Sequence, residues 1–151
     1  MPGRLQRAGK WTLTIAPSSG SGPFTMNESK QWSDFPTCLA ALLGFGAVAL
    51  GAYGAHGLRV APELHVMWEK AVQYQMVHSA VLLALASRFQ RYAVGFAGLA
   101  LGLLFFSGSL YLYVLGFSPA ILKLTPVGGT ILLLSWISLA WQALWSRKPK
   151  D

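Results

Sequence analysis

The stretch that decides the fold is GFGAVALGAYGAHGLRVAPELHVMWEKAVQYQMVHS, residues 44–79. It joins two motifs. A small-residue apolar segment ends in Gly51-Ala-Tyr-Gly-Ala-His-Gly57, and the next apolar segment opens with Gln73-Tyr-Gln-Met-Val-His78. Because long apolar segments flank both motifs, their polar side chains are predicted to lie at or inside a membrane.

The composition of the whole chain supports a membrane protein. Of its 151 residues, 54% are hydrophobic and only 11% are charged, and the mean hydropathy is +0.46. These values exceed those of ordinary soluble domains. Each of four apolar runs holds about the 17–25 residues that a spanning helix needs. The runs cover residues 36–57, 70–88, 93–116 and 125–145. The sequence therefore predicts an all-α membrane protein, with four transmembrane helices in an up-down bundle over residues 35–146.

The two ends of the chain have a different composition. Residues 1–34 form a predicted flexible polar tail with a linker-like run from Ser18 to Gly22, and residues 147–151 form a basic C-terminal tail. The basic start of the chain fits two interpretations. It is either an organelle transit peptide or upstream sequence that precedes a true start at Met26, which would make residues 1–25 a misassigned beginning. The second interpretation is favoured, because Met26 leaves a short polar segment before Pro36, a residue suited to a first helical turn.

The distribution of Lys and Arg predicts the orientation in the membrane. Four spans place both termini and the middle loop on one side, and the other two loops on the opposite side. The terminal side carries Arg4, Arg7, Lys10, Lys30, Arg88, Arg91, Arg147, Lys148 and Lys150, and the opposite side carries Arg59, Lys70 and Lys123. Because cytoplasmic loops are enriched in these residues, both termini are predicted to be cytoplasmic, with or without residues 1–25. The basic residues form no stripe of the kind that binds nucleic acid.

Small residues predict where helices pack closely, because they let backbones approach each other in lipid. The predicted packing residues are Ala47, Gly51, Gly54, Ala55 and Gly57 in the first helix and Gly98 and Gly102 in the third. Such faces serve either folding within one chain or association with a second copy or another membrane protein. Six aromatic residues lie near predicted membrane interfaces, where anchoring is the expected role: Trp68, Tyr92, Tyr111, Tyr113, Trp141 and Trp145.

Candidate chemistry gathers in the outer half of the first two helices. The candidate polar cluster comprises His56, Glu69, Gln73, Tyr74, Gln75 and His78. A histidine inside a membrane is expensive unless it has a hydrogen-bonding partner, so His78 marks either a functional site or a polar contact that holds helices together. No metal site is expected. His65 and His78 are thirteen residues apart, which separates them by roughly 20 Å on one helix, and the lone Cys38 excludes a cysteine cluster.

Three classes of function remain open. The leading hypothesis is a non-enzymatic binding or assembly module without a cofactor. A small-solute pore or carrier, formed by one chain or an oligomer, would need a watery path past Ser107 or Ser135. A membrane enzyme would need Glu69 and His78 to reach one reacting atom as acid and base. No Asp or Glu occurs between Ala71 and Lys150, so carboxylate-driven proton relays are not expected in the last three spans.

The two motifs, together with Trp68 ahead of Tyr74-Gln75-Met-Val-His78, resemble the YgdD-like small membrane proteins, the family of transmembrane protein 256. The resemblance covers about residues 37–145. It implies a four-helix protein of the bacterial inner membrane, with the mitochondrial inner membrane as the alternative, and it implies no reaction, substrate or cofactor. The first 25–35 residues look like an addition to the family's usual beginning.

Overall fold

The computed structural model of the protein describes residues 34–145, and this part of the chain is helical throughout apart from short connections. The elements are α2 (Asp34–His56), α3 (Pro62–Ala86), α4 (Phe89–Val114), the short 3-10 helix η1 (Pro119–Lys123) and α5 (Leu124–Trp145). The predicted all-α class is confirmed. The predictions for the N-terminal tail up to residue 33, including the start at Met26, and for the C-terminal tail lie outside the described residues.

Three of the four long helices are long and apolar enough to cross a membrane. These segments are Phe35–His56, Phe89–Val114 and Pro119–Trp145. Helix α3 is not among them, because charged and polar residues interrupt it from Glu63 to His78. Its apolar part follows His78 and continues to Ala86. Length and composition therefore identify three spans, and α3 is the most polar of the four long helices.

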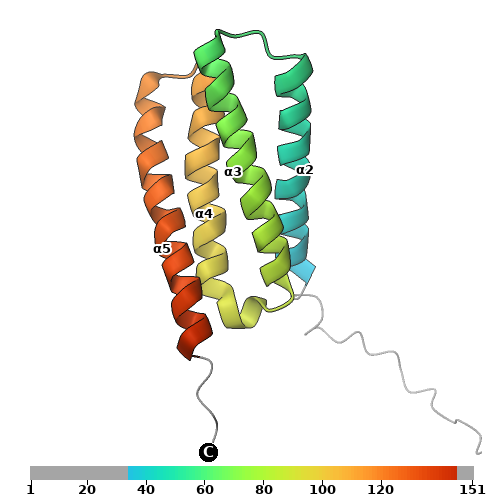
Figure 1. The fold of residues 1–151 in the computed structure, drawn as a ribbon, viewed down its shortest axis with the longest axis vertical. Coiled ribbons are helices and arrows are strands. Elements are labelled where there is room, and N and C mark those ends of the chain that lie inside the picture. The colour runs from blue at the N-terminus through green and yellow to red at the C-terminus, as the bar shows by residue number, and fades with distance from the viewer. Residues whose placement is uncertain (1–33, 146–151) are drawn as a thin grey trace, which may run out of the picture.

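The four long helices stand side by side and alternate in direction (Figure 1). Extensive contacts within the described chain are formed by pairs that are consecutive in sequence, namely α2 with α3, α3 with α4 and α4 with α5. The 3-10 helix η1 packs across the ends of α4 and α5. Helices α2 and α5 thus lie at the two edges, and α3 and α4 occupy the middle of the arrangement.

The start of the second helix differs from the prediction. The helix begins at Pro62 rather than near residue 70, so Glu63, His65, Glu69 and Lys70 lie on α3 instead of in a loop. Pro62 occupies the first helical turn, where its fixed φ and missing N–H carry no cost. The preceding loop is short, and the N–H groups of Gly57 and Leu58 both donate to the carbonyl of Tyr53 at 2.7 and 2.9 Å.

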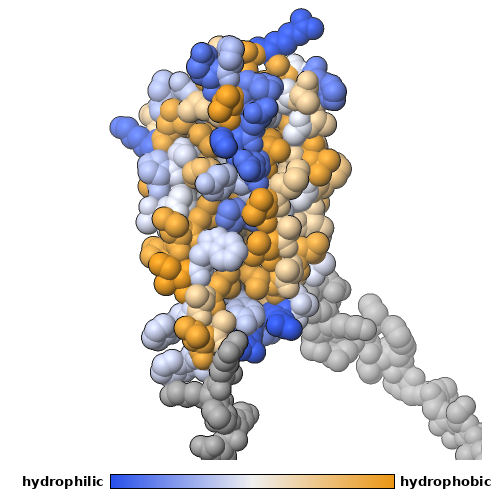
Figure 2. Space-filling view, viewed as in Figure 1, coloured by the Kyte–Doolittle hydropathy of each residue, from blue (hydrophilic) through white to orange (hydrophobic). Residues whose placement is uncertain are grey.

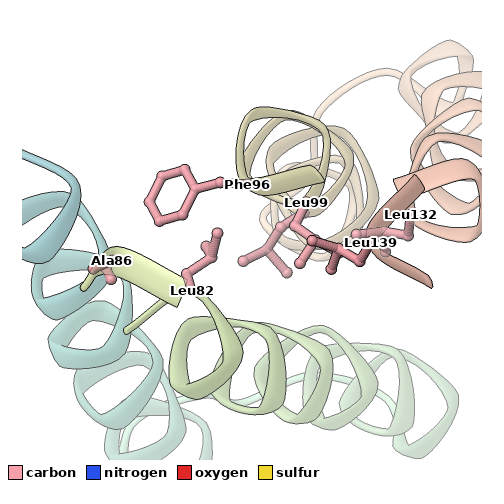
Figure 3. Close-up of a cluster of buried hydrophobic side chains, with 8 residues drawn as sticks. Leu82, Ala86, Phe96, Leu99, Leu132 and Leu139 are labelled. Carbon is pink, nitrogen blue, oxygen red and sulfur yellow. The ribbon is translucent and has the colours of Figure 1, made fainter. Parts of the chain in front are cut away.

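Two apolar clusters fill the interior. The first joins α2, α3, α4 and α5 near the end where α3 runs into α4, and Figure 3 shows its side chains converging from three of these helices. Its buried members are Ala40, Leu82, Ala86, Phe96, Leu99, Leu103, Leu132 and Leu139. The second cluster lies toward the opposite end and contains Trp68, Ala71, Leu110, Tyr111 and Val114.

Trp68 and Tyr111 are therefore core residues, and the prediction that they anchor the chain at a membrane interface is wrong. Trp68 is 1% exposed and Tyr111 is 8% exposed. Their rings meet edge to face with centroids 4.7 Å apart. An edge-to-face pair is a favoured aromatic geometry and adds to the stability of the cluster.

Glycines set the distance between α4 and α5. A Cβ on Gly102 would lie 2.9 Å from the Leu132 nitrogen and 3.0 Å from the Gly128 carbonyl oxygen, and one on Gly98 would collide with Ser135. In α2, Ala47 is fully buried, and a Cβ on Gly51 would lie 3.2 Å from Val72. These positions let neighbouring backbones approach closely.

Two other predicted packing residues, Gly57 and Ala55, differ from the glycines that lie between helices. Gly57 follows the last residue of α2, and a Cβ there would meet the ring of Tyr53 of α2 at 2.9 Å, so this glycine makes room at the end of that helix and not between helices. Ala55 is exposed.

Candidate functional site

The six residues of the candidate polar cluster do not meet at one point. His56 is exposed at the end of α2. The other five lie on α3, and the helical turn directs them to different surroundings. Gln75 and His78 are buried, at 8% and 7% exposure, whereas Glu69, Gln73 and Tyr74 are exposed. The cluster therefore divides into the buried Gln75 and His78, which contact other helices, and exposed residues, of which Glu69 and Gln73 line a groove.

The buried side chains Trp68 and Gln75 join α3 to α2. The Trp68 indole donates to the carbonyl of Leu50, and the Gln75 amide donates to the carbonyl of Leu43, both at 2.9 Å. The donors are seven residues apart, as are the acceptors, so the two bonds repeat after two helical turns along the antiparallel pair. Two contacts of the same kind thus fix the register between α2 and α3.

Glycines on α2 make these two hydrogen bonds possible. A Cβ on Gly54 would lie 2.6 Å from the Trp68 indole nitrogen, and a Cβ on Gly46 would lie 3.1 Å from the Gln75 amide nitrogen. The first distance is impossible without movement of the indole. The first motif therefore includes a glycine that accommodates Trp68, the residue that precedes the second motif.

Helix α3 is also joined to α4, and α4 to α5, by hydroxyl groups. Ser107 of α4 donates to the carbonyl of Ala71 at 2.9 Å. Ser109 of α4 and the Thr125 hydroxyl at the start of α5 lie 2.7 Å apart. Hydrogen bonds between helices stabilise membrane proteins by a modest amount each, on average about 0.6 kcal/mol in double-mutant cycles.

His78 lies beside two aromatic side chains, Tyr74 of its own helix and Trp136 of α5. Its Nδ1 is 2.8 Å from the carbonyl oxygen of Tyr74, and since a carbonyl only accepts, Nδ1 is the protonated nitrogen. The neutral Nε2 then accepts from the indole of Trp136 on α5, at 3.4 Å. The Tyr74 ring stacks on the imidazole at 5.8 Å and contacts Phe106 of α4 at 4.5 Å. Both ring nitrogens of His78 are thus engaged inside the protein.

The exposed polar residues of α3 border a groove between α2 and α3. Its volume is about 340 Å³, and its lining is formed by Gly51, Gly54, Ala55, His65, Trp68, Glu69, Val72, Gln73 and Met76. His65 Nε2 lies 3.5 Å from Glu69 Oε1, and these side chains are 36% and 65% exposed. The Lys70 ammonium donates to Gln73 Oε1 at 3.5 Å. Charged, polar and apolar groups therefore share one concave surface, which contains residues of both sequence motifs.

A second cavity, of about 220 Å³, lies between α2, α3 and α4. Its lining is largely apolar and includes Gln75, Ser107 and Tyr111. The Tyr111 hydroxyl is buried and, among the side chains that the structure describes, is the one buried polar group without a hydrogen-bond partner. A buried unsatisfied hydroxyl costs roughly 1–3 kcal/mol.

The histidines stand in three separate settings: His56 at the end of α2, His65 in the groove and His78 among the aromatic rings. Within residues 34–145, no group of three or more His, Cys, Asp or Glu side chains is placed to hold a metal ion.

Several residues that matter here are absent from the predicted cluster. His65 is one of them, although its spacing of four from Glu69 is the signal of a pair on one helical face. Trp136 contacts His78, Phe106 contacts Tyr74, and no local pattern connects residues so far apart in sequence.

Comparison with known proteins identifies relatives over most of the chain. Residues 50–129 match a family model described as "Protein of unknown function (DUF423)". A UPF0382 membrane protein of Haemophilus influenzae is 40% identical over 72% of this chain and 93% of its own. The UPF0382 inner membrane protein YgdD of Escherichia coli is 39% identical over 69% and 85%. A UPF0382 membrane protein of Staphylococcus aureus is 40% identical over 67% and 88%. No solved structure matches significantly.

Proposed function

This chain belongs to the DUF423 family of membrane proteins, and from that premise we propose that it is a non-enzymatic binding module. It is a multi-pass membrane protein of the bacterial inner, or plasma, membrane. The proposed binding site is the groove between α2 and α3. The buried polar residues of α3 hold the helices together and leave this groove as the place where a ligand meets charged groups.

The proposed topology has four spans, namely the three apolar segments and α3. Helices α2 and α4 are both apolar enough to span, and Figure 1 shows them running in the same direction. If both cross the membrane in that direction, the chain must return between them, and α3 is the long element that lies between them. The excess of Lys and Arg on the terminal side supports a topology with both termini in the cytoplasm and the groove toward the outer face.

One observation carries the proposal, namely that Gln73 and Gln75 have opposite roles although they are two residues apart. Gln75 is buried and donates to the Leu43 carbonyl of α2. Gln73 is exposed and lies in the groove beside Glu69. Because a step of two residues rotates a side chain by roughly 200° around a helix, the second motif supplies one structural and one ligand-facing amide.

The geometry does not favour a small-solute pore or carrier, or a membrane enzyme. Ser107 and Ser135, which a watery path would need, are buried and donate to the carbonyls of Ala71 and Ile131. The apolar cluster around Leu99 occupies the inner half of the bundle. Glu69 and His78 are nine residues apart on α3, about 13 Å along the axis, so they cannot act together on one reacting atom.

Cysteine accessibility tests the groove directly. In a background with Cys38→Ser, single cysteines are placed as Gln73→Cys or Gln75→Cys, and intact cells or oriented vesicles are treated with a membrane-impermeant maleimide. We expect rapid labelling of Gln73→Cys from the outer side. Gln75→Cys serves as the matched control and is expected to stay unlabelled until the protein is denatured, because its side chain faces α2.

Two results would overturn the proposal. If Gln73→Cys resists the reagent from both sides in a folded protein, the groove is closed to solutes and a binding role there is lost. If Gln75→Cys is labelled as fast as Gln73→Cys, water reaches between α2 and α3, and a solute path becomes the better account.

A further inference from the structure

The groove between α2 and α3 changes in polarity along its length. On the α3 side its lining follows one helical stripe, from His65 and Glu69 through Gln73 to Met76. These residues span eleven positions, or roughly 16 Å along the axis. The His65–Glu69 pair lies at the end next to the α2–α3 loop, and the apolar Val72 and Met76 lie farther from that end. In Figure 2 hydrophilic residues likewise gather over the upper part of α3, above a hydrophobic middle.

The opposite wall of the groove is formed by Gly51, Gly54 and Ala55 of α2. These residues have little or no side chain, so this wall is apolar and follows the helix backbone closely. The apolar part of the groove, at Val72 and Met76, continues toward the hydrocarbon. Its polar rim, at His65 and Glu69, lies at the end of the helices. This order of polarity matches an amphiphile whose headgroup stays at the membrane surface while its chain extends inward.

The charges at the rim specify the headgroup. Glu69 is the one carboxylate that lines the groove within the described chain, and its side chain is 65% exposed. The carbonyl oxygen of the Gln73 side chain adds a second acceptor, and the Lys70 ammonium lies within 3.5 Å of that oxygen. The Glu69 carboxylate in the groove and the Lys70 ammonium, which lies outside the lining and beside Gln73, complement a zwitterion with one cationic and one anionic group.

We propose that this groove binds an aminophospholipid, meaning a phospholipid with a primary ammonium in its headgroup. The lipid ammonium donates to Glu69 and Gln73, and the lipid phosphate lies toward Lys70. One acyl chain follows Val72 and Met76 along the small residues of α2. The inference rests on the proposed function, because it names the ligand of the same groove.

A primary ammonium is preferred for a chemical reason. It offers three N–H donors to the carboxylate and the amide oxygen, and charge-assisted hydrogen bonds are the stronger kind. A trimethylammonium headgroup carries the same charge and cannot donate at all. A glycerol headgroup leaves the lipid anionic, so Glu69 would repel it. A free phosphoethanolamine has the right charges but forfeits the apolar contacts of the acyl chain.

Lipid retention by the full chain tests the inference. The detergent-purified protein is titrated with dioleoyl phosphatidylethanolamine, phosphatidylcholine or phosphatidylglycerol, and bound lipid is counted by native mass spectrometry. Exposed ion pairs contribute little, so we expect a preference for the ethanolamine lipid over the choline lipid of about threefold to fivefold. Free phosphoethanolamine at the same concentrations should not compete.

Two variants separate the groove from general surface charge. Glu69→Gln removes the carboxylate with little change in shape and should abolish the preference, bringing ethanolamine and choline lipids to equal retention. Glu63→Gln is the control, because Glu63 lies exposed in the first turn of α3 and outside the groove lining. It should retain the full preference.

The outcomes distinguish this inference from the broader proposal. Equal retention of all three lipids by the wild-type chain, or an unchanged preference in Glu69→Gln, overturns the aminophospholipid while Gln73→Cys can still show an open groove. Displacement by free phosphoethanolamine would identify a soluble zwitterion as the ligand and overturn the lipid. A groove closed to maleimide in Gln73→Cys removes the binding site itself.

Discussion

At the scale of single residues, the glycine motif of α2 is explained by what it accommodates. Gly54 is buried against the Trp68 indole, and Gly51 lies against Val72. The hydrogen bond from Trp68 to the Leu50 carbonyl requires the indole to approach the α2 backbone closely. A residue with a side chain at position 54 would hold the two helices apart.

Gly54→Ala is therefore expected to destabilise the protein. The new Cβ would lie 2.6 Å from the indole nitrogen, so Trp68 must move and weaken its bond to Leu50. Overpacking of this kind costs about 1–3 kcal/mol of unfolding free energy. Thermal unfolding in detergent measures the change. Gly108→Ala is the control, since its Cβ would meet only Leu104, at 4.0 Å, and alanine favours a helix. Equal stability of the two variants would contradict this account of Gly54.

Tyr111→Phe should leave stability unchanged or raise it by about 1 kcal/mol, because the substitution removes a buried hydroxyl that has no partner. The ring keeps its edge-to-face contact with Trp68. Trp68→Phe provides the comparison and should be destabilising, because it removes a satisfied donor together with packing volume. A clear loss of stability in Tyr111→Phe would show that the hydroxyl has a partner in the membrane.

At the scale of helices, hydrophobic runs predicted the existence of all four long elements, because apolar length is a property of the sequence alone. The start of α3 was missed because Glu63, Glu69 and Lys70 break the apolar run, although Pro62 is a common first residue of a helix. The candidate site was predicted only in part. Trp68 and Gln75 donate to backbone carbonyls of α2, and since every residue has a carbonyl, the acceptor leaves no signature in the sequence.

The neighbouring glycines 128 and 129 of α5 should respond differently to alanine. A Cβ on Gly128 would collide with the α4 backbone at Phe106, whereas one on Gly129 would lie 3.7 Å from the Phe106 ring, an ordinary contact. Gly128→Ala should therefore lower the unfolding free energy by about 1–3 kcal/mol. Gly129→Ala should be neutral or slightly stabilising. Matched unfolding curves of the two variants test the α4–α5 packing, and similar losses in both would refute it.

At the scale of the whole molecule, the arrangement of the helices depends most on α3. It is the least apolar of the long helices, yet it packs between α2 and α4 and contacts α5 through His78. Its buried Gln75 and His78 form hydrogen bonds to α2 and α5, and such bonds lower the cost of a polar helix inside a membrane. The proposed four-span topology requires α3 to cross the bilayer between two apolar spans.

The positions of the two ends of α3 test this claim most directly. Ala61 precedes the helix and Ser87 follows it, and both are exposed. Single cysteines at these positions, in the Cys38→Ser background, are treated with impermeant maleimide from each side of the membrane. The account predicts labelling of Ala61→Cys from the outer side and of Ser87→Cys from the cytoplasmic side. Labelling of both cysteines from the same side would contradict it, because α3 would then not cross the membrane.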